Sequence, residues 1–204
     1  PILENLGART REEHPYEMRM NGKRIWIHDF VLDLSFDSLE RARELRQNFE
    51  DAFLQTWAGD KENDTFNRLV TSANMKARQI WVIRALGHYL SQLQRGTRQG
   101  YIADCIRRHS DITRDFFSLF ELRFDPDQDR RSADRQSARL EKSILNRIEQ
   151  VENLDDDRIL RSYLELILAA QRTNYYQMDE TGKDKEYLSI KFLPKQLSVA
   201  PKPK

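Results

Sequence analysis

The strongest constraint on the fold lies in residues 157–177, where a helical pattern gives way within a few positions to an aromatic strand pattern. The apolar residues of the helical part recur at spacings of three and four, and they are Ile159, Leu160, Tyr163, Leu164, Ile167 and Leu168. Beyond this helix the sequence predicts a strand pair at residues 173–178 and 187–192. Two strands alone are marginal in water, so this pair needs a sheet or a helix to pack against.

A second hairpin is predicted near the start of the chain. Asn21-Gly22 suits the positive φ angles of a type I′ turn between strands at residues 16–20 and 23–34. Apolar residues point to both faces of the second strand: Trp26, Phe30 and Leu32 on one, and Ile25, Ile27 and Val31 on the other. Such a strand is typically covered on both sides, which requires partners that this chain does not visibly supply. Since the chain also opens at Pro1, we expect both ends to be pieces of larger domains.

The middle of the chain is predicted to be helical, with apolar periodicity at about residues 39–57, 65–72, 76–94, 99–109, 112–123, 140–151 and 155–168. Ser35 or Asp37 can cap the first of these helices, and Asn74 can cap the one at 76–94. The wide apolar arc of residues 76–94 predicts a place at the centre of the bundle. The last two helices should form an antiparallel hairpin. The hydrophilic stretch 127–137 is either a frayed helix start or a mobile loop.

These elements predict a mainly α fold, a multi-helix bundle with a short β-hairpin at each end. Residues 1–34 are expected to be a piece of a preceding domain. Residues 35–172 should form the helical domain, and residues 173–204 the first strands of a following domain.

Composition excludes several classes of protein. Lys and Arg total 34 and Asp and Glu 33, which leaves a net charge of +1 and disfavours nucleic-acid binding. No apolar run approaches the roughly 18 residues that span a bilayer, so no membrane partner is expected. Cys105 is the single cysteine and lies on an apolar stripe, which indicates a core residue and a reducing, cytoplasmic compartment.

Five stretches, in this order along the chain, are similar to one protein family: Leu3-Glu4-Asn5-Leu6-Gly7 with Glu13-His14-Pro15-Tyr16-Glu17; Ile25-Trp26-Ile27-His28-Asp29-Phe30; residues 66–70 with 84–90; Leu119-Phe120-Glu121-Leu122-Arg123-Phe124-Asp125-Pro126; and residues 157–177. The chain resembles the large bacterial NAD-specific glutamate dehydrogenases, in the helical segment just before their catalytic domain. The resemblance covers nearly the whole chain, with variable stretches near Asp60 and Arg130. It implies that residues 1–34 are the end of an α/β domain of regulatory type and that residues 173–204 are the first strands of the catalytic domain.

The resemblance implies that the parent enzyme converts L-glutamate, NAD and water to 2-oxoglutarate, ammonia and NADH. This segment would be a non-catalytic connector or scaffold whose partners are the flanking domains of the same chain, in a parent that is a homo-oligomer. The alternative is a free-standing helical interaction or regulatory module, which amphipathic helices without catalytic groups would also suit. That alternative does not explain why the chain carries two hairpins.

The chemistry of a dehydrogenase is not recognisable in the segment. The seven glycines show no Gly-x-Gly-x-x-Gly spacing, and the closest piece, residues 96–100, joins two predicted helices without a preceding strand. The substrate lysines and aspartate of glutamate dehydrogenases also have no matching motif. We therefore predict no catalytic, cofactor-binding or metal residues here, with NAD bound elsewhere in the parent.

Metal sites are weakly supported. Residues 125–136 begin like an EF-hand loop, but Arg130 replaces the required Gly and Gln136 the bidentate Glu, so a polar helix break is favoured. The acids at 155–157 are better explained as helix-capping groups. The histidines, which are His14, His28, His88 and His109, show no His-x-x-x-His pair. His28 beside Asp29 most simply makes a structural hydrogen bond.

Arginine is the cation that this chain favours, with 24 Arg against 10 Lys. Arg suits bidentate pairing with carboxylates and is enriched at interfaces, although ion pairs along single helices explain such usage equally well. Arg107-Arg108 and Arg130-Arg131 are the pairs that we expect to reach a partner.

Overall fold

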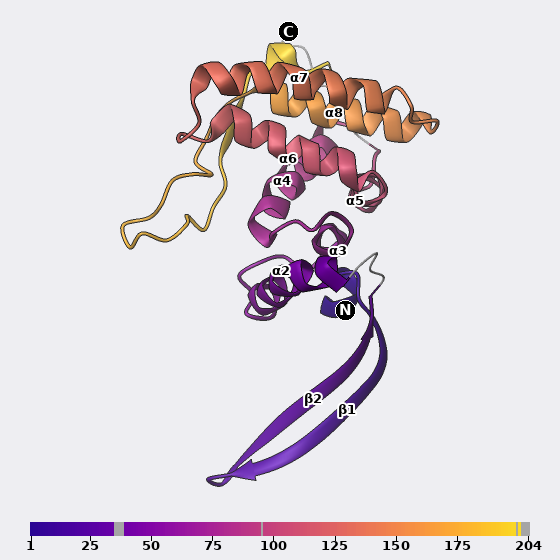
Figure 1. The fold of residues 1–204 in the computed structure, drawn as a ribbon, viewed down its shortest axis with the longest axis vertical. Coiled ribbons are helices and arrows are strands. Elements are labelled where there is room, and N and C mark those ends of the chain that lie inside the picture. The colour runs from indigo at the N-terminus through magenta and orange to yellow at the C-terminus, as the bar shows by residue number, and fades with distance from the viewer. Residues whose placement is uncertain (35–38, 95, 199, 201–204) are drawn as a thin grey trace. The chain divides into compact units, whose positions relative to one another are not determined.

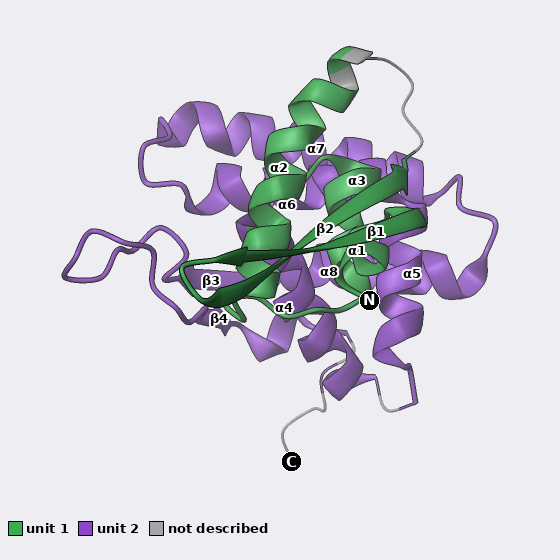
Figure 2. Ribbon diagram, turned by 90° about the horizontal axis from the view of Figure 1, so that it is seen from below, with its two compact units in different colours: residues 1–77 green, residues 78–204 purple. Residues whose placement is uncertain are grey.

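The computed structural model describes residues 1–34, 39–94, 96–198 and 200 (Figure 1). The chain divides into two compact units, residues 1–77 and 78–204 (Figure 2), and each is described by itself. Helices dominate both units in number, and each unit holds one two-stranded antiparallel sheet among its described residues. The prediction of a mainly α fold with a hairpin toward each end is confirmed. No described helix has the length and apolar character needed to cross a bilayer.

The hairpin of the first unit is built on the predicted turn. Strand β1 (Arg9–Met20) pairs with β2 (Lys23–Asp33), and the register Met20↔Lys23 leaves Asn21 and Gly22 as a two-residue loop. Their φ angles are 51° and 73°, as a type I′ turn requires. The first strand is longer than predicted, because pairing continues past a register shift between Thr10 and Glu12 to Arg9↔Asp33.

Both faces of this hairpin are exposed. The cross-strand pairs Met18↔Ile25 and Tyr16↔Ile27 share one face, whereas Trp26 and Phe30 belong to the other, as the alternation predicts. Every residue of the two strands is exposed except Leu32, which is half-buried. The cover expected from apolar residues on both faces is therefore not supplied by the described residues.

One long helix and three short helical segments pack together among the described residues of the first unit. They are α1 (Ile2–Asn5), α2 (Leu39–Trp57), the 3₁₀ turn η1 (Thr65–Arg68) and α3 (Leu69–Ala73). α1 contacts α2 and η1, and α2 contacts α3. The buried apolar residues of this unit include Leu6, Ala8, Leu45, Ala52, Phe66, Leu69, Val70 and Ala73. The cap expected at Ser35 or Asp37 lies outside the described residues.

Asn74 plays a different part from the one predicted. It ends α3 in the left-handed conformation, with φ 50° and ψ 42°, and does not form the N-cap of the next helix. Its side-chain oxygen accepts a hydrogen bond from Asn48 Nδ2 at 2.9 Å. Asn tolerates the left-handed region better than other non-glycine residues, so it can stop one helix while tying it to α2.

Gly7 provides a test of packing in the first unit. Its φ is +86°, and a Cβ there would collide with the Thr71 hydroxyl. Replacing Gly7 with Ala should therefore lower the free energy of unfolding by about 1–3 kcal/mol, through backbone strain plus displacement of Thr71. Thermal unfolding followed by circular dichroism measures the change. Gly22→Ala is the matched control, because Gly22 has a similar φ of +73° but open space around its Cβ position. Equal losses for the two variants would contradict the contact with Thr71.

The second unit is a helical bundle. It comprises α4 (Ala77–Leu93), α5 (Gln99–Arg108), α6 (Ser110–Phe124), α7 (Arg130–Ile148) and α8 (Leu154–Ala169). α7 contacts both α6 and α8, and α7 and α8 lie side by side in Figure 1. The largest fully buried side chains of this unit include Ile80, Ile83, Leu86, Leu90, Ile102, Ile106, Phe116, Phe120 and Tyr163. Several of these come from α4, so its wide apolar arc predicted burial correctly.

The hydrophilic stretch 127–137 contains a helix start. α7 begins at Arg130, and the Asp129 side chain caps it by accepting a hydrogen bond from the Ser132 N–H at 2.8 Å. The preceding helix α6 ends at Phe124, and the backbone of the next residue, Asp125, is extended as expected before Pro126.

The second sheet follows α8 without an intervening loop. Strand β3 (Ala170–Thr173) starts at the residue after Ala169, and it pairs with β4 (Ile190–Phe192). Arg123 of α6 holds this junction by donating Nη2 to the carbonyls of Leu168 at 2.9 Å and Ala170 at 3.3 Å. A 3₁₀ turn, η2 (Pro194–Gln196), comes after β4.

The predicted bounds of the third strand, 173–178, are wrong. The paired residues of β3 end at Thr173, because the Asn174 side chain takes the place of the next backbone hydrogen bonds between the two strands. Its Oδ1 accepts from the Ser189 N–H at 2.6 Å, and its Nδ2 donates to the Tyr187 carbonyl at 2.9 Å. An amide side chain that satisfies backbone groups in this way competes with regular strand pairing.

Candidate functional site

The most concentrated polar chemistry among the described residues surrounds Asp156, in the first turn of α8. The Asn153 side chain caps this helix by accepting hydrogen bonds from the N–H groups of Asp155 and Asp156. The capped turn leaves the Asp156 carboxylate only 4% exposed, facing the C-terminal end of α5. The helical turn that Asn153 caps thus places the Asp156 carboxylate inside the helical bundle.

Two basic side chains meet this carboxylate. Arg108 binds both of its oxygens, with Nη2 at 2.6 Å from Oδ1 and Nε at 3.1 Å from Oδ2. His109 places Nε2 at 2.9 Å from Oδ2. Tyr101 adds a hydrogen bond from its hydroxyl to Oδ1 at 3.3 Å. These four residues are called the Asp156 cluster, and they join α5 and the residue after it to α8.

The electrostatics of the Asp156 cluster favour the ionised carboxylate. Burial raises the pKa of Asp156, but the hydrogen bonds from Arg108 and His109 and their positive charge outweigh burial and hold the pKa below its ordinary value. The same hydrogen bond and charge raise the pKa of Arg108. The cluster is therefore an ion-paired joint around an ionised carboxylate.

Cys105 adjoins the cluster but does not offer a reactive thiolate. Its side chain is fully buried, with Sγ at 3.8 Å from the Asp156 carbonyl. Burial, with a further contribution from the charge of Asp156, raises the pKa of this thiol far above its ordinary value. A thiol in this state is a poor nucleophile.

A metal ion would fit these groups poorly. One ligand atom from each of Cys105, His109 and Asp156 lies within 4.8 Å of the other two. Both oxygens of Asp156, however, are already engaged by the Arg108 guanidinium, and the thiol is held protonated. A cation would have to displace a bidentate arginine, so the arrangement suits a structural joint better than a metal centre.

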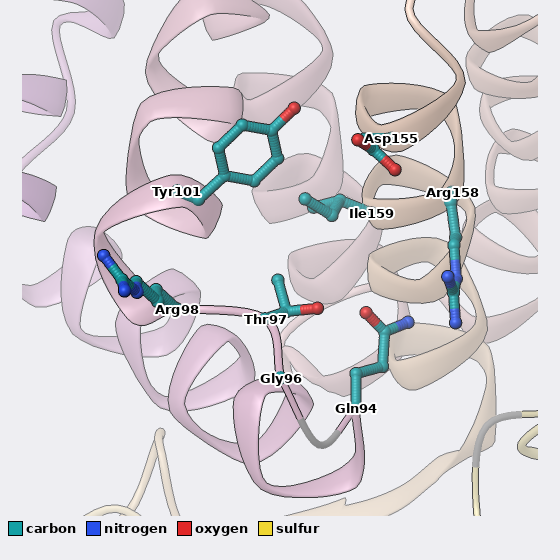
Figure 3. A pocket seen from close by; sticks show the side chains of 8 residues that line it. All are labelled: Gln94, Gly96, Thr97, Arg98, Tyr101, Asp155, Arg158 and Ile159. Carbon is teal, nitrogen blue, oxygen red and sulfur yellow. The ribbon is translucent and has the colours of Figure 1, made fainter.

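Two pockets lie beside the cluster. One of about 670 Å³ is lined by Arg108, His109, the first turn of α6, Arg147 of α7 and the residues between α7 and α8, together with Asp156. The other, of about 320 Å³, is bordered by Thr97, Arg98, Tyr101, Asp155 and Arg158 (Figure 3). In Figure 3 Tyr101 and Arg98 lie on one side of this second opening, and Asp155 and Arg158 of α8 lie on the other.

The turn predicted at residues 96–100 is shorter, because residues 96–98 lead into α5 and Gln99 and Gly100 belong to that helix; Gly96 has a φ of +109°. In the described part of the chain, the element directly before this turn is the helix α4. A dinucleotide phosphate loop instead requires a strand directly before it. The candidate EF-hand at residues 125–136 is likewise interrupted by a helix, because Arg130 and Gln136 both lie within α7.

The predicted histidine and arginine candidates fall in different places. His28 contacts Glu13 across the first hairpin at 2.8 Å, and His14 contacts Glu12 at 3.2 Å. His88 is half-buried on α4. Arg107 lies 3.7 Å from Asp104, while Arg108 and His109 enter the Asp156 cluster. Arg130 donates to the Arg123 carbonyl at 2.9 Å and lines a separate pocket near β3.

Asp156 is the residue that the sequence analysis did not single out. The acids at 155–157 were explained together as helix-capping groups, whereas only Asp156 is buried. A signal was present, because Asp156 precedes Ile159, Leu160 and Tyr163 at helical spacings of three, four and seven. A carboxylate on the apolar face of a helix indicates a buried partner, and Arg108 is that partner.

Comparisons with known proteins match most of the chain, in three successive segments. Residues 1–44 match a family model described as glutamate dehydrogenase, ACT3 domain; residues 61–126 match glutamate dehydrogenase, helical motif 3; and residues 143–204 match bacterial NAD-glutamate dehydrogenase, catalytic domain. The order of these segments agrees with the order of the similar stretches in the sequence.

Each of three curated relatives contains a region that aligns with the whole of this chain. Each is an NAD-specific glutamate dehydrogenase, from Halomonas elongata at 44% identity, Pseudomonas aeruginosa at 42% and Mycobacterium tuberculosis at 29%. The chain spans 12% of the length of the first and 13% of the other two.

Proposed function

Because the chain belongs to the family of bacterial NAD-specific glutamate dehydrogenases, we propose that it is a non-catalytic helical connector within such an enzyme. The complete enzyme would oxidise glutamate with NAD in the cytoplasm, and NAD would bind outside this segment. The connector would hold the start of the catalytic domain against the helices that precede it.

Packing within the second unit is the observation that carries this proposal. Segments that match two different family models share one core there, since Tyr163 stacks on Phe116 with ring centroids 5.8 Å apart. Asp156 reaches Arg108, and Arg123 reaches the carbonyls of Leu168 and Ala170. Helical motif and catalytic-domain segment would thus move as one body.

The ends of the chain fit the same proposal. Residues 1–34 would complete a regulatory-type domain, whose remaining part would cover the exposed apolar face formed by Tyr16, Met18, Ile25 and Ile27. Large exposed apolar patches usually mark such contacts. Residues 35–172 would form the helical connector, which includes α8 although the catalytic-domain match begins at residue 143, and residues 173–204 would supply the first strands of the catalytic domain. The assembled enzyme would be a homo-oligomer.

The purified chain should show no glutamate-dependent reduction of NAD. We expect this because its described residues offer ion-paired joints rather than a dinucleotide site. The measurement is NADH absorbance after mixing chain, NAD and glutamate, with a complete NAD-specific glutamate dehydrogenase as the positive control. Turnover by the chain alone would overturn the non-catalytic assignment.

The size of the native polypeptide tests the connector itself. An antibody raised against this chain should detect, in source cells, a band several times larger than the chain. A band of the chain's own size would instead favour a free-standing helical interaction module.

A further inference from the structure

A pocket of about 470 Å³ beside the second sheet is lined by three cations and no carboxylate. Arg130 comes from the start of α7, Arg172 from β3 and Lys191 from β4. The remaining lining is mostly polar and consists of Gln171, Thr173, Asn174, Gln177 and Ser189, together with Phe124. Arg130, Arg172 and Lys191 are called the basic cluster.

Two members of the basic cluster face each other at close range. Arg172 and Lys191 are direct partners in the register of the antiparallel pair, and both are exposed. Like charges directly opposite each other destabilise a ladder. A sheet of so few residues is only marginally stable, so the repulsion between Arg172 and Lys191 destabilises the β3–β4 pair.

The cations of the basic cluster lack the ion pairs that other arginines of the second unit make. Arg78 lies 2.9 Å from Asp184 and Arg161 lies 3.0 Å from Asp157, whereas in the described part of the chain none of the three cluster cations has a carboxylate within 4.0 Å. Arg130 is nevertheless ordered, because its Nη1 donates to the Arg123 carbonyl at 2.9 Å. The cluster is thus positioned without being neutralised.

We propose that the basic cluster is a docking surface for an acidic segment of the same polypeptide, outside this chain. The inference rests on the proposed function, because relatives of which this chain spans 12–13% leave ample polypeptide to supply such a segment. Carboxylates match the paired donors of Arg130 and Arg172 and would neutralise the opposed charges on β3 and β4. Docking would therefore stabilise the sheet that it covers.

Protein carboxylates fit this surface better than a phosphate ion does. Phosphate sites commonly use free backbone N–H groups at a helix start. At the start of α7 the Ser132 N–H is already taken by the Asp129 carboxylate, so it is not free to bind a phosphate. The cations come from three separate elements, and amide and hydroxyl groups lie between them, which suits several side chains along an extended segment.

The test uses a blocked hexaglutamate peptide as the acidic segment, titrated calorimetrically into the 204-residue chain. We expect saturable binding that weakens as salt is added, since salt screens exposed charges. The double variant Arg172→Ala/Lys191→Ala should bind at least tenfold more weakly. It should also melt at the same or a higher temperature, because the like-charge pair is gone, and this shows that lost binding is not lost folding.

The matched control is Lys183→Ala/Lys185→Ala, which removes two exposed or half-buried cations that do not line this pocket. It should leave peptide affinity unchanged. Three results would overturn the docking surface: no peptide binding, an equal loss in the control variant, or inorganic phosphate binding as tightly as the peptide.

The native-size measurement separates this inference from the proposed function. A native polypeptide of the chain's own size would overturn the function and the assignment of the segment to the same polypeptide. A large native polypeptide combined with no peptide binding would overturn the docking surface alone.

Discussion

Replacing Tyr163 with alanine should lower the free energy of unfolding of the second unit by about 3–5 kcal/mol. The side chain is 0% exposed and stacks on Phe116 with an interplanar angle of 10°. Its hydroxyl donates to the Ile83 carbonyl at 3.2 Å, which links α8 to α4. Truncation therefore removes a large apolar surface, opens a cavity and breaks a buried hydrogen bond at once.

Urea unfolding followed by circular dichroism measures the effect of Tyr163→Ala. Tyr163→Phe keeps the ring and should cost about 1 kcal/mol, the usual net value of one hydrogen bond. Tyr187→Ala is the exposed control, because that side chain is 61% exposed, and should change the stability little. A loss below about 1 kcal/mol for Tyr163→Ala would show that the shared core is not formed in solution.

Replacing Asp156 with alanine is expected to cost about 2–4 kcal/mol, since it leaves the Arg108 guanidinium and His109 without their buried acceptor. The value lies below that for a fully buried pair because the Arg108 side chain is 39% exposed and can regain water. The control is Asp157→Ala at the next position. Its carboxylate pairs with Arg161 in a more exposed setting, so it should cost about 0.5 kcal/mol.

The contribution of Asp156 should also depend on pH in a defined direction. Its folded-state pKa is below the ordinary value of 3.8, so the folded protein holds this proton less tightly than the unfolded chain. The resulting stability is present above that ordinary value and is lost as the pH falls through the folded-state pKa. The difference between the wild type and Asp156→Asn should therefore shrink in acid. A difference that grows in acid would contradict the ion pair.

The sequence was most informative where local chemistry determines local structure. Asn21-Gly22 tolerates the positive φ angles that the observed turn needs, and the apolar spacing within residues 76–94 predicts burial whatever the neighbours are. Asn74 was misassigned because a short polar side chain can stop one helix as readily as it begins another. The third strand was misplaced because its aromatic residues favour β structure. In the structure the Asn174 side chain instead bonds the backbone groups of Tyr187 and Ser189, in place of regular strand pairing.

The candidate site could not be predicted because it depends on contacts between distant segments. Three consecutive acids look equivalent in the sequence, and the burial of one of them depends on the angle at which α8 meets α5. Arg107 and Arg108 likewise look equivalent, yet only Arg108 reaches Asp156. The basic cluster needs the strand register for its recognition, because Arg172 and Lys191 are far apart in sequence and become opposed only when β3 and β4 pair.

The direct passage from α8 into β3 gives the second unit the geometry of a lever. α8 has 16 residues, which at about 1.5 Å per residue makes an arm of roughly 24 Å. Asp156 lies near one end of this arm, and the first strand residue is attached to the other without a flexible joint. A tilt of about 5° at the Asp156 end would carry the strand sideways by roughly 2 Å over that length. Because Arg123 ties the junction between α8 and β3 to α6, such a tilt would carry α6 and the first strand together.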